Sequence, residues 1–204
     1  MATLGISEVK IANMALAHIG GSATIESITE QSEEARKVDL WYDFARRQTL
    51  AIADWNFARA RQVLATDAED PPTDIWAYRY QYPTDAVVIR KIENQYTGFR
   101  DSDPVPFEIE LNAARNAKTI LTDLSDAEAV FTLNVTNTPL FTEFFVEMFS
   151  MALAAKIAYS ITGKKSVREQ MINGFNSMAR IAPASNANES MRPPLRDADY
   201  IRGR

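Results

Sequence analysis

The sequence of 204 residues contains no cysteine and only one histidine, His18. Without cysteine the chain has no disulfide, no thiolate nucleophile and no cysteine-ligated zinc, and one histidine cannot build a multi-histidine metal centre. The seven glycines include one adjacent pair, Gly20-Gly21, and neither nucleotide-binding glycine spacing occurs around it. We therefore expect no metal site, no cofactor and no enzymatic activity.

Long apolar runs are also missing. No stretch approaches the roughly 18 apolar residues that a membrane-spanning helix needs, and the Met1 end lacks the basic start and apolar run of a signal peptide. With 46% hydrophobic and 24% charged residues, the composition is that of a globular protein. We expect a soluble protein that is not secreted and has no membrane partner.

The chain has no excess of positive charge. Lys and Arg number 22 against 27 Asp and Glu, a formal net charge of −5. Proteins that grip nucleic acid through bulk charge are basic, so tight DNA binding is not expected. Double-stranded DNA could pass along such a protein without specific binding.

Apolar residues at helical spacing predict four helices, each with a start or stop signal. Ser7 is a typical N-cap for the first, and Ser32 for the second. Asn137 followed by Pro139 predicts the start of the third, and Ser166 with Glu169 reads as a capping box for the fourth. The predicted helices are 7–19, 32–53, 139–162 and 166–182. The third is apolar around most of its circumference, so it should be central, with Phe145, Met148 and Phe149 buried.

Between the second and third helices the pattern changes to short β-rich runs. Trp76, Tyr78, Tyr80 and Tyr82 alternate with period two, which is typical of a strand. Further strands are predicted at 87–92, 107–111, 118–122 and 128–135. We therefore predict an α+β fold: an antiparallel-type helical bundle (1–56 and 137–182), a β-rich insertion (57–136) and an extended C-terminal arm (183–204). Pro193-Pro194 and the lack of periodicity suggest the arm.

The candidate chemical groups have simpler interpretations. His18 has no carboxylate three or four residues away, so we interpret it as a surface or packing histidine rather than a base. Asp101 with Asp103, and Glu108 with Glu110, are paired carboxylates in a turn and a strand, which usually means solvated charges. A catalytic pair in a glycosidase is the alternative.

Two further features suggest contacts. The aromatic alternation from Trp76 to Tyr82 could stack nucleic-acid bases, but few basic residues accompany it, which favours a hydrophobic sheet face packed on the helices. Arg59 and Arg61 share one face if their segment is extended, and would pair with acidic neighbours or a partner chain. The arm is unusually apolar and basic for a tail, which favours docking on a partner. Its predicted partner-binding residues are Met191, Arg192, Leu195, Arg196, Tyr200, Ile201, Arg202 and Arg204.

An ordered set of short segments resembles the head-to-tail adaptor family of short-tailed bacteriophages, often called tail tubular protein A. The resemblance extends from Ile11 to the Asp199-Tyr200-Ile201-Arg202 end, and no single motif carries it. The segments are Ile11-Ala12-Asn13-Met14-Ala15-Leu16-Ala17-His18-Ile19-Gly20, Asp54-Trp55-Asn56-Phe57-Ala58, Tyr82-Pro83-Thr84-Asp85, Ile120-Leu121-Thr122-Asp123-Leu124 and Val135-Thr136-Asn137-Thr138-Pro139-Leu140-Phe141.

The resemblance implies a structural virion protein without catalytic residues. The family forms a homo-oligomeric ring, a dodecamer, between the portal protein and the tail nozzle protein, and its C-terminal arm looks suited to clasping the portal. We therefore expect this protein at the head-tail junction of a virion, after synthesis in the host cytoplasm. The alternatives are a virion-associated glycan-cleaving enzyme that uses an acidic pair and a nucleic-acid-binding module, which the charge balance opposes.

Overall fold

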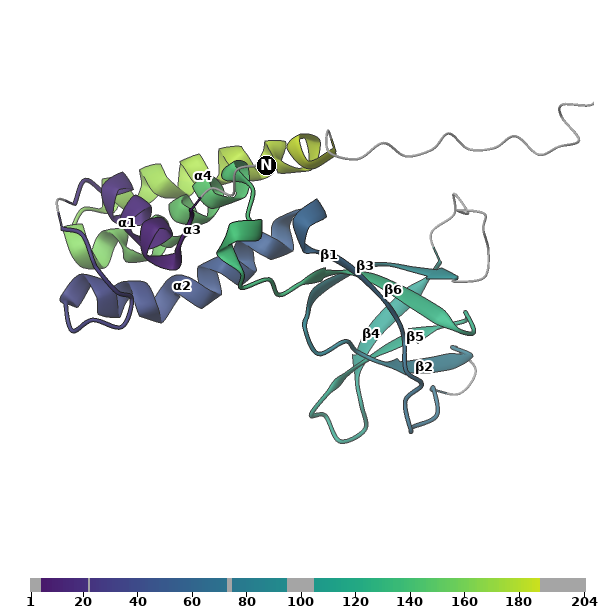
Figure 1. Ribbon diagram of the computed structural model, residues 1–204. Helices are drawn as coiled ribbons and strands as arrows, with labels where there is room; N and C mark the ends of the chain where they lie inside the picture. The colour runs from purple at the N-terminus through teal and green to yellow at the C-terminus, as the bar shows by residue number, and fades with distance from the viewer. Residues whose placement is uncertain (1–4, 22, 73–74, 95–104, 188–204) are drawn as a thin grey trace, which may run out of the picture. The chain divides into compact units, whose positions relative to one another are not determined.

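The computed structural model describes residues 5–21, 23–72, 75–94 and 105–187 (Figure 1). Its α helices α1–α4 and two three-stranded sheets make it a mixed α and β protein. The chain forms two compact units. One combines Met1–Arg59 with Thr132–Asn186 and holds the four helices, and the other contains Ala60–Phe131 and most of the strands.

The first two helices begin at the predicted serine caps. Helix α1 spans Glu8–His18, and the hydroxyl of Ser7 accepts a hydrogen bond from the Lys10 N–H at 3.2 Å. Helix α2 spans Glu33–Ile52, and Ser32 accepts in the same way from Ala35. Each cap satisfies a backbone donor that has no partner inside its helix, which fixes where the helix begins.

Helix α3 begins later than the sequence predicted. It spans Glu143–Thr162 with Thr142 as its N-cap, because Pro139 belongs to a separate 3-10 turn, Thr138–Leu140. The prediction of a helix from residue 139 is therefore wrong by one turn. At the other end Gly163 adopts a left-handed conformation, with φ of 67°, and its N–H bonds to the Tyr159 carbonyl. Glycine adopts that conformation without the steric cost of a β-carbon.

Helix α3 is the central element of its unit. Phe145, Met148 and Phe149 are fully buried, which confirms that prediction. Helix α1 packs on it, as does α2 through an edge-to-face contact between Tyr42 and Phe149. By length and composition α3 could cross a membrane, but its apolar residues are mostly buried within the protein.

Helix α4 spans Lys165–Ala187 and corrects two predictions. It begins at Lys165, so Ser166 lies inside the first turn and is not the N-cap of a capping box. It also continues through Pro183, whereas an extended arm was expected from that residue onward. An internal proline removes one helical hydrogen bond but does not always end a helix. The rest of the expected arm, residues 188–204, lies outside the described residues.

The aromatic segment that follows α2 packs into the core of the helical unit. The Asp54-Trp55-Asn56-Phe57 segment follows α2 and ends in a short 3-10 turn, Asn56–Ala58. Trp55 is buried, donates its indole N–H to the Thr49 carbonyl at 3.0 Å, and meets Phe145 edge-to-face. Phe57 packs on both Phe141 and Phe145. The segment therefore supplies aromatic side chains to the core around α3.

The strands form two sheets of three. The first has the order β1-β6-β3, with β1 at Arg59–Val63, β6 at Ala127–Leu133 and β3 at Ala86–Asn94. The second has the order β2-β5-β4 and is antiparallel, with β2 at Tyr78–Gln81, β5 at Lys118–Thr122 and β4 at Phe107–Leu111.

The predicted strands 107–111 and 118–122 are confirmed with the same bounds, and those at 87–92 and 128–135 correspond to β3 and β6. The predicted strand across Trp76–Tyr82 is shorter, because only Tyr78–Gln81 pairs as β2. For β1, the sequence offered only the spacing of Arg59 and Arg61, which would share one face of an extended segment.

Candidate functional site

All eight predicted partner-binding residues belong to the C-terminal arm. The eight arm residues, Met191, Arg192, Leu195, Arg196, Tyr200, Ile201, Arg202 and Arg204, lie outside the described residues, as do Asp101 and Asp103. The remaining candidates fall within the two units.

His18 lies where α1 packs on α3. Its Nε2 atom is 3.0 Å from the Ser150 hydroxyl and 3.4 Å from a carboxylate oxygen of Glu147. A serine-histidine-carboxylate relay needs the serine and the acid on opposite ring nitrogens, but here both approach the same one. Ser150 is also fully buried and donates to the Glu147 carbonyl at 2.8 Å. The cluster therefore joins two helices, as expected of a packing histidine, and gives substrate no access to the hydroxyl.

The two glutamates of β4 do not form a metal site. Glu108 and Glu110 alternate along the strand, so both point to the same face of the sheet. No group of three histidine, aspartate or glutamate side chains suited to a metal occurs among the described residues. Glu108 instead accepts a hydrogen bond from the Trp76 indole at 3.3 Å.

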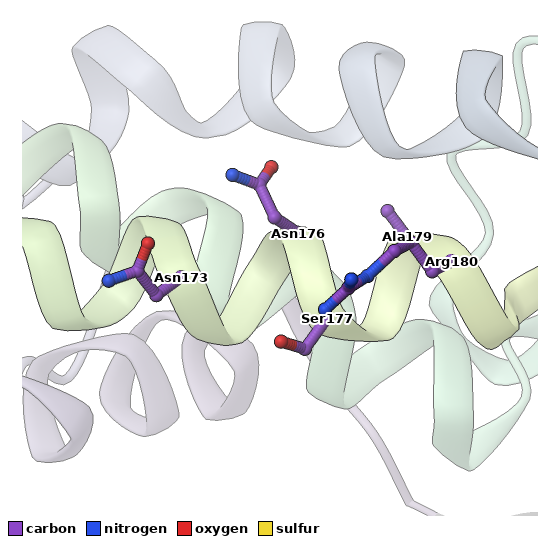
Figure 2. Close-up of a pocket in the computed structure, with 5 residues that line it drawn as sticks. All are labelled: Asn173, Asn176, Ser177, Ala179 and Arg180. Atoms are coloured by element: carbon purple, nitrogen blue, oxygen red, sulfur yellow. The ribbon is translucent and has the colours of Figure 1, made fainter.

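The hollow shown in Figure 2 is built from α4 alone. Its lining residues are Asn173, Asn176, Ser177, Ala179 and Arg180. Their side chains do not converge, since Asn176 and Ser177 lie on different sides of the helix ribbon (Figure 2). The lining holds no histidine, lysine or carboxylate that could act as a general base toward the Ser177 hydroxyl, so it supports no hydrolytic mechanism.

The predicted pairing of Arg59 and Arg61 with acidic neighbours is confirmed. Arg59 contacts Asp54 at 2.6 Å, and Arg61 reaches from β1 to Glu93 on β3, across the middle strand β6. Burial alone would raise the pKa of Glu93, but Lys91 and Arg61 outweigh it through hydrogen bonds and charge and hold that pKa below its usual value. These arginines therefore stabilise the structure and are not free for an anionic ligand.

The aromatic alternation does not form a continuous platform. Tyr80 is buried and donates its hydroxyl to the Leu124 carbonyl at 2.9 Å. Tyr78 stacks against it and is partly exposed, while Trp76 and Tyr82 lie outside the paired strand. A row of exposed rings is what base stacking requires, so the arrangement favours a sheet face packed within its own unit.

Several large side chains of α2 and α3 are exposed to solvent. We define the α2–α3 patch as Leu40, Trp41, Phe44, Lys156 and Tyr159. Leu40 is 70% exposed, Phe44 53% and Tyr159 50%. Trp41 meets Phe44 edge-to-face at 5.8 Å, and the Lys156 ammonium lies 4.9 Å from the Phe44 ring.

The sequence patterns did not predict the α2–α3 patch, although one signal for an exposed contact surface was present. The apolar face predicted for α2 contains Ala35, Val38, Trp41 and Ala45, and these are mostly buried. Leu40 and Phe44 lie four residues apart on the otherwise charged face, next to Asp39 and Asp43. Large apolar residues at that spacing on a charged face indicate a contact surface rather than a core.

Comparison of the sequence with known protein families and with curated proteins finds no family model and no curated protein that matches.

Proposed function

We propose that the protein is a structural virion protein: a head-to-tail adaptor whose ring joins the portal to the tail nozzle and continues the DNA channel. The observation that carries this proposal is the α2–α3 patch. Leu40, Phe44 and Tyr159 have half or more of their surface exposed, and the Phe44 ring contacts Trp41. Exposed apolar surface that extends over neighbouring residues marks interaction sites. A second copy is the occupant that the resemblance to ring-forming adaptors implies.

The positions of the resembling segments support the same architecture. Trp55 and Phe57 fill the aromatic core, and Asn13 anchors the connection between α1 and α2. Segments that build the core are those expected to persist between proteins that share a fold. We therefore propose a helical bundle with residues 57–136 as a β insertion and the arm as a C-terminal extension, with its start moved to residue 188.

The proposed partners follow from this role. The arm residues would dock on the portal, the opposite side of the ring would meet the nozzle protein, and neighbouring subunits would contact one another through the α2–α3 patch. A ring that conducts DNA must not hold it, so acidic side chains should outnumber basic ones on its lumen, as the net charge of −5 allows. A lumen lined mainly by Arg and Lys would contradict this.

Electron microscopy of the purified protein, with and without portal rings, tests the proposal. The wild-type protein should form rings, alone or on portals. The double variant Leu40→Glu and Phe44→Glu should remain a folded monomer, because carboxylates cannot be buried at an apolar interface without a large cost. Val63→Glu is the matched control, since Val63 is an exposed apolar residue of the other unit and is 49% exposed. Rings that form normally from the double variant would show that this surface is not the subunit contact.

A further inference from the structure

Strand β4, Phe107–Leu111, is an open edge of its sheet. It pairs with β5 on one side, and no strand in the described ranges pairs with the other side. The opposite edge of the same sheet is covered. The segment after β1 runs along β2, where the Gln81 N–H donates to the Ala65 carbonyl at 2.8 Å and the Asp67 N–H donates to Arg79 at 2.9 Å. Among the described residues, the β4 edge is therefore the edge of this sheet that can accept another strand.

The register identifies which backbone groups of β4 face outward. In an antiparallel pair, opposed residues alternate between those that exchange hydrogen bonds and those that do not. Asn112 donates to Ala117 at 2.9 Å just beyond the strand end, and the same register continues as Leu111 opposite Lys118 and Glu110 opposite Thr119. Glu108 and Glu110 therefore bond to β5. Phe107, Ile109 and Leu111 direct their N–H and C=O groups toward the open edge.

The side chains of β4 give this edge a distinct character. Ile109 is 42% exposed and Leu111 54%, and both lie on the same face as Phe107. Glu108 and Glu110 lie on the other face. Within the described part of the chain, the Glu110 carboxylate has no hydrogen bond or ion pair. The edge therefore presents alternating apolar and acidic side chains together with unpaired backbone groups.

Two copies of β4 do not match each other. A second β4 could place apolar residues opposite apolar residues in several antiparallel registers. Each such register that pairs three or more residues also sets glutamate against glutamate: Glu108 against Glu108, Glu108 against Glu110, or Glu110 against Glu110. Like charges directly opposite are destabilising. Charge complementarity instead requires Lys or Arg opposite these glutamates.

We propose that β4 binds an extended segment of a different protein, in which apolar residues alternate with Lys or Arg, as an added antiparallel strand. Backbone hydrogen bonds to Phe107, Ile109 and Leu111 supply affinity, and pairing with Glu108 and Glu110 selects the basic sequence. This inference does not depend on the adaptor role, because it uses neither the α2–α3 patch nor the arm.

The experiment uses the full chain and a synthetic peptide with the core Val-Lys-Ile-Lys-Val, beside a matched peptide with Glu in place of Lys. Hydrogen exchange of individual amides is the readout. The lysine peptide should slow exchange at Phe107, Ile109 and Leu111 at least tenfold and leave Glu108 and Glu110, already bonded to β5, almost unchanged. The glutamate peptide should not bind measurably. Protection confined to any other segment would overturn the proposal.

Variants of β4 separate edge pairing from loss of folding. Ile109→Pro removes the central outward N–H without removing a bond to β5, as proline permits on edge strands, and should weaken peptide binding at least tenfold. Ile109→Val is the matched control and should bind normally. The double variant Glu108→Lys and Glu110→Lys should prefer the glutamate peptide. An unchanged preference there would refute the charge argument, and circular dichroism verifies that each variant is folded.

Two other occupants would also overturn the proposal. If the outward amides of the protein alone become protected as its concentration rises, and ultracentrifugation shows dimers, β4 binds a second copy. If the lysine peptide binds only after residues 188–204 are deleted, the chain's own C-terminal segment occupies the edge.

Discussion

Asn13 forms two hydrogen bonds with the backbone of Ile25. The side-chain amide donates to the Ile25 carbonyl and its oxygen accepts the Ile25 N–H, both at 2.9 Å. An asparagine can make this reciprocal pair because it carries a donor and an acceptor on one planar group. Asn13 thus holds the connection between α1 and α2 against α1, and Ile25 itself is buried.

Asn13→Asp should destabilise the protein by about 1–3 kcal/mol, because the ionised side chain cannot donate to the Ile25 carbonyl and leaves it unsatisfied. Urea unfolding of the two proteins measures the difference. Thr24→Ala, at an exposed position of the same connection, serves as a control for general sensitivity of this segment. Equal stability of Asn13→Asp and wild type would show that the pair contributes nothing.

Phe145→Ala should cost about 3–5 kcal/mol of unfolding free energy, because the side chain is fully buried among other aromatic rings. Leu140→Ala removes an apolar side chain that is mostly exposed in the same unit, and it should change stability by less than about 0.5 kcal/mol. Thermal unfolding followed by circular dichroism compares them. An unchanged melting temperature for Phe145→Ala would contradict the assignment of α3 as the central helix.

Gly163→Ala should destabilise the protein by about 1 kcal/mol, because alanine pays a steric cost at a positive φ that glycine does not. No heavy atom lies within 4 Å of where the β-carbon would be, so the loss comes from backbone strain alone. Gly5→Ala, where space is equally open and φ is ordinary, should be neutral. The denaturant midpoints of wild type, Gly163→Ala and Gly5→Ala measure these differences in stability.

The paired Glu93 predicts acid sensitivity. Its pKa is lower in the folded protein than in the unfolded chain, so ionisation of Glu93 stabilises the fold above the unfolded pKa of about 4.3. That contribution is lost as pH falls through the lower, folded pKa. The unfolding free energies of wild type and Glu93→Gln should therefore differ at about pH 6 and converge toward about pH 3. A difference that does not vary with pH would show that the carboxylate charge is not responsible.

Deletion of residues 188–204 should leave a folded protein with near-native thermal stability but abolish attachment to portal rings in a pull-down. The cut follows Ala187 because α4 continues to that residue. If the truncated protein still occupied portals fully, the docking surface would have to lie on the helical unit instead.

Sequence patterns predicted the helices best where local signals decide them. Ser7 and Ser32 are caps whose partners lie three residues away, and the apolar circumference of α3 requires burial wherever the helix packs. The sequence patterns predicted the wrong first residue of a helix where two local signals compete. Pro139 and Ser166 each resemble a helix start, yet Thr142 caps α3 and α4 begins at Lys165. The choice between adjacent starts depends on packing that local residues do not encode.

The site features depended on contacts distant in sequence. Glu147 and Ser150 meet His18 only because α1 packs on α3, so no spacing around residue 18 could reveal them. The reach of Arg61 across β6 to Glu93 likewise required strand order. The paired strands 107–111 and 118–122 were predicted with their bounds, but which edge of the sheet is open follows from the segment that covers β2.

The interruption of the helical unit by Ala60–Phe131 also has a consequence for the time course of synthesis. Helices α1 and α2 both pack on α3, which leaves the ribosome only after the whole intervening segment has been made. At about 5–20 residues per second, they wait on the order of 5 to 20 seconds with their apolar faces unpaired. During that interval α1 and α2 are substrates for chaperones and proteases, and the strands can fold before the helices that precede them.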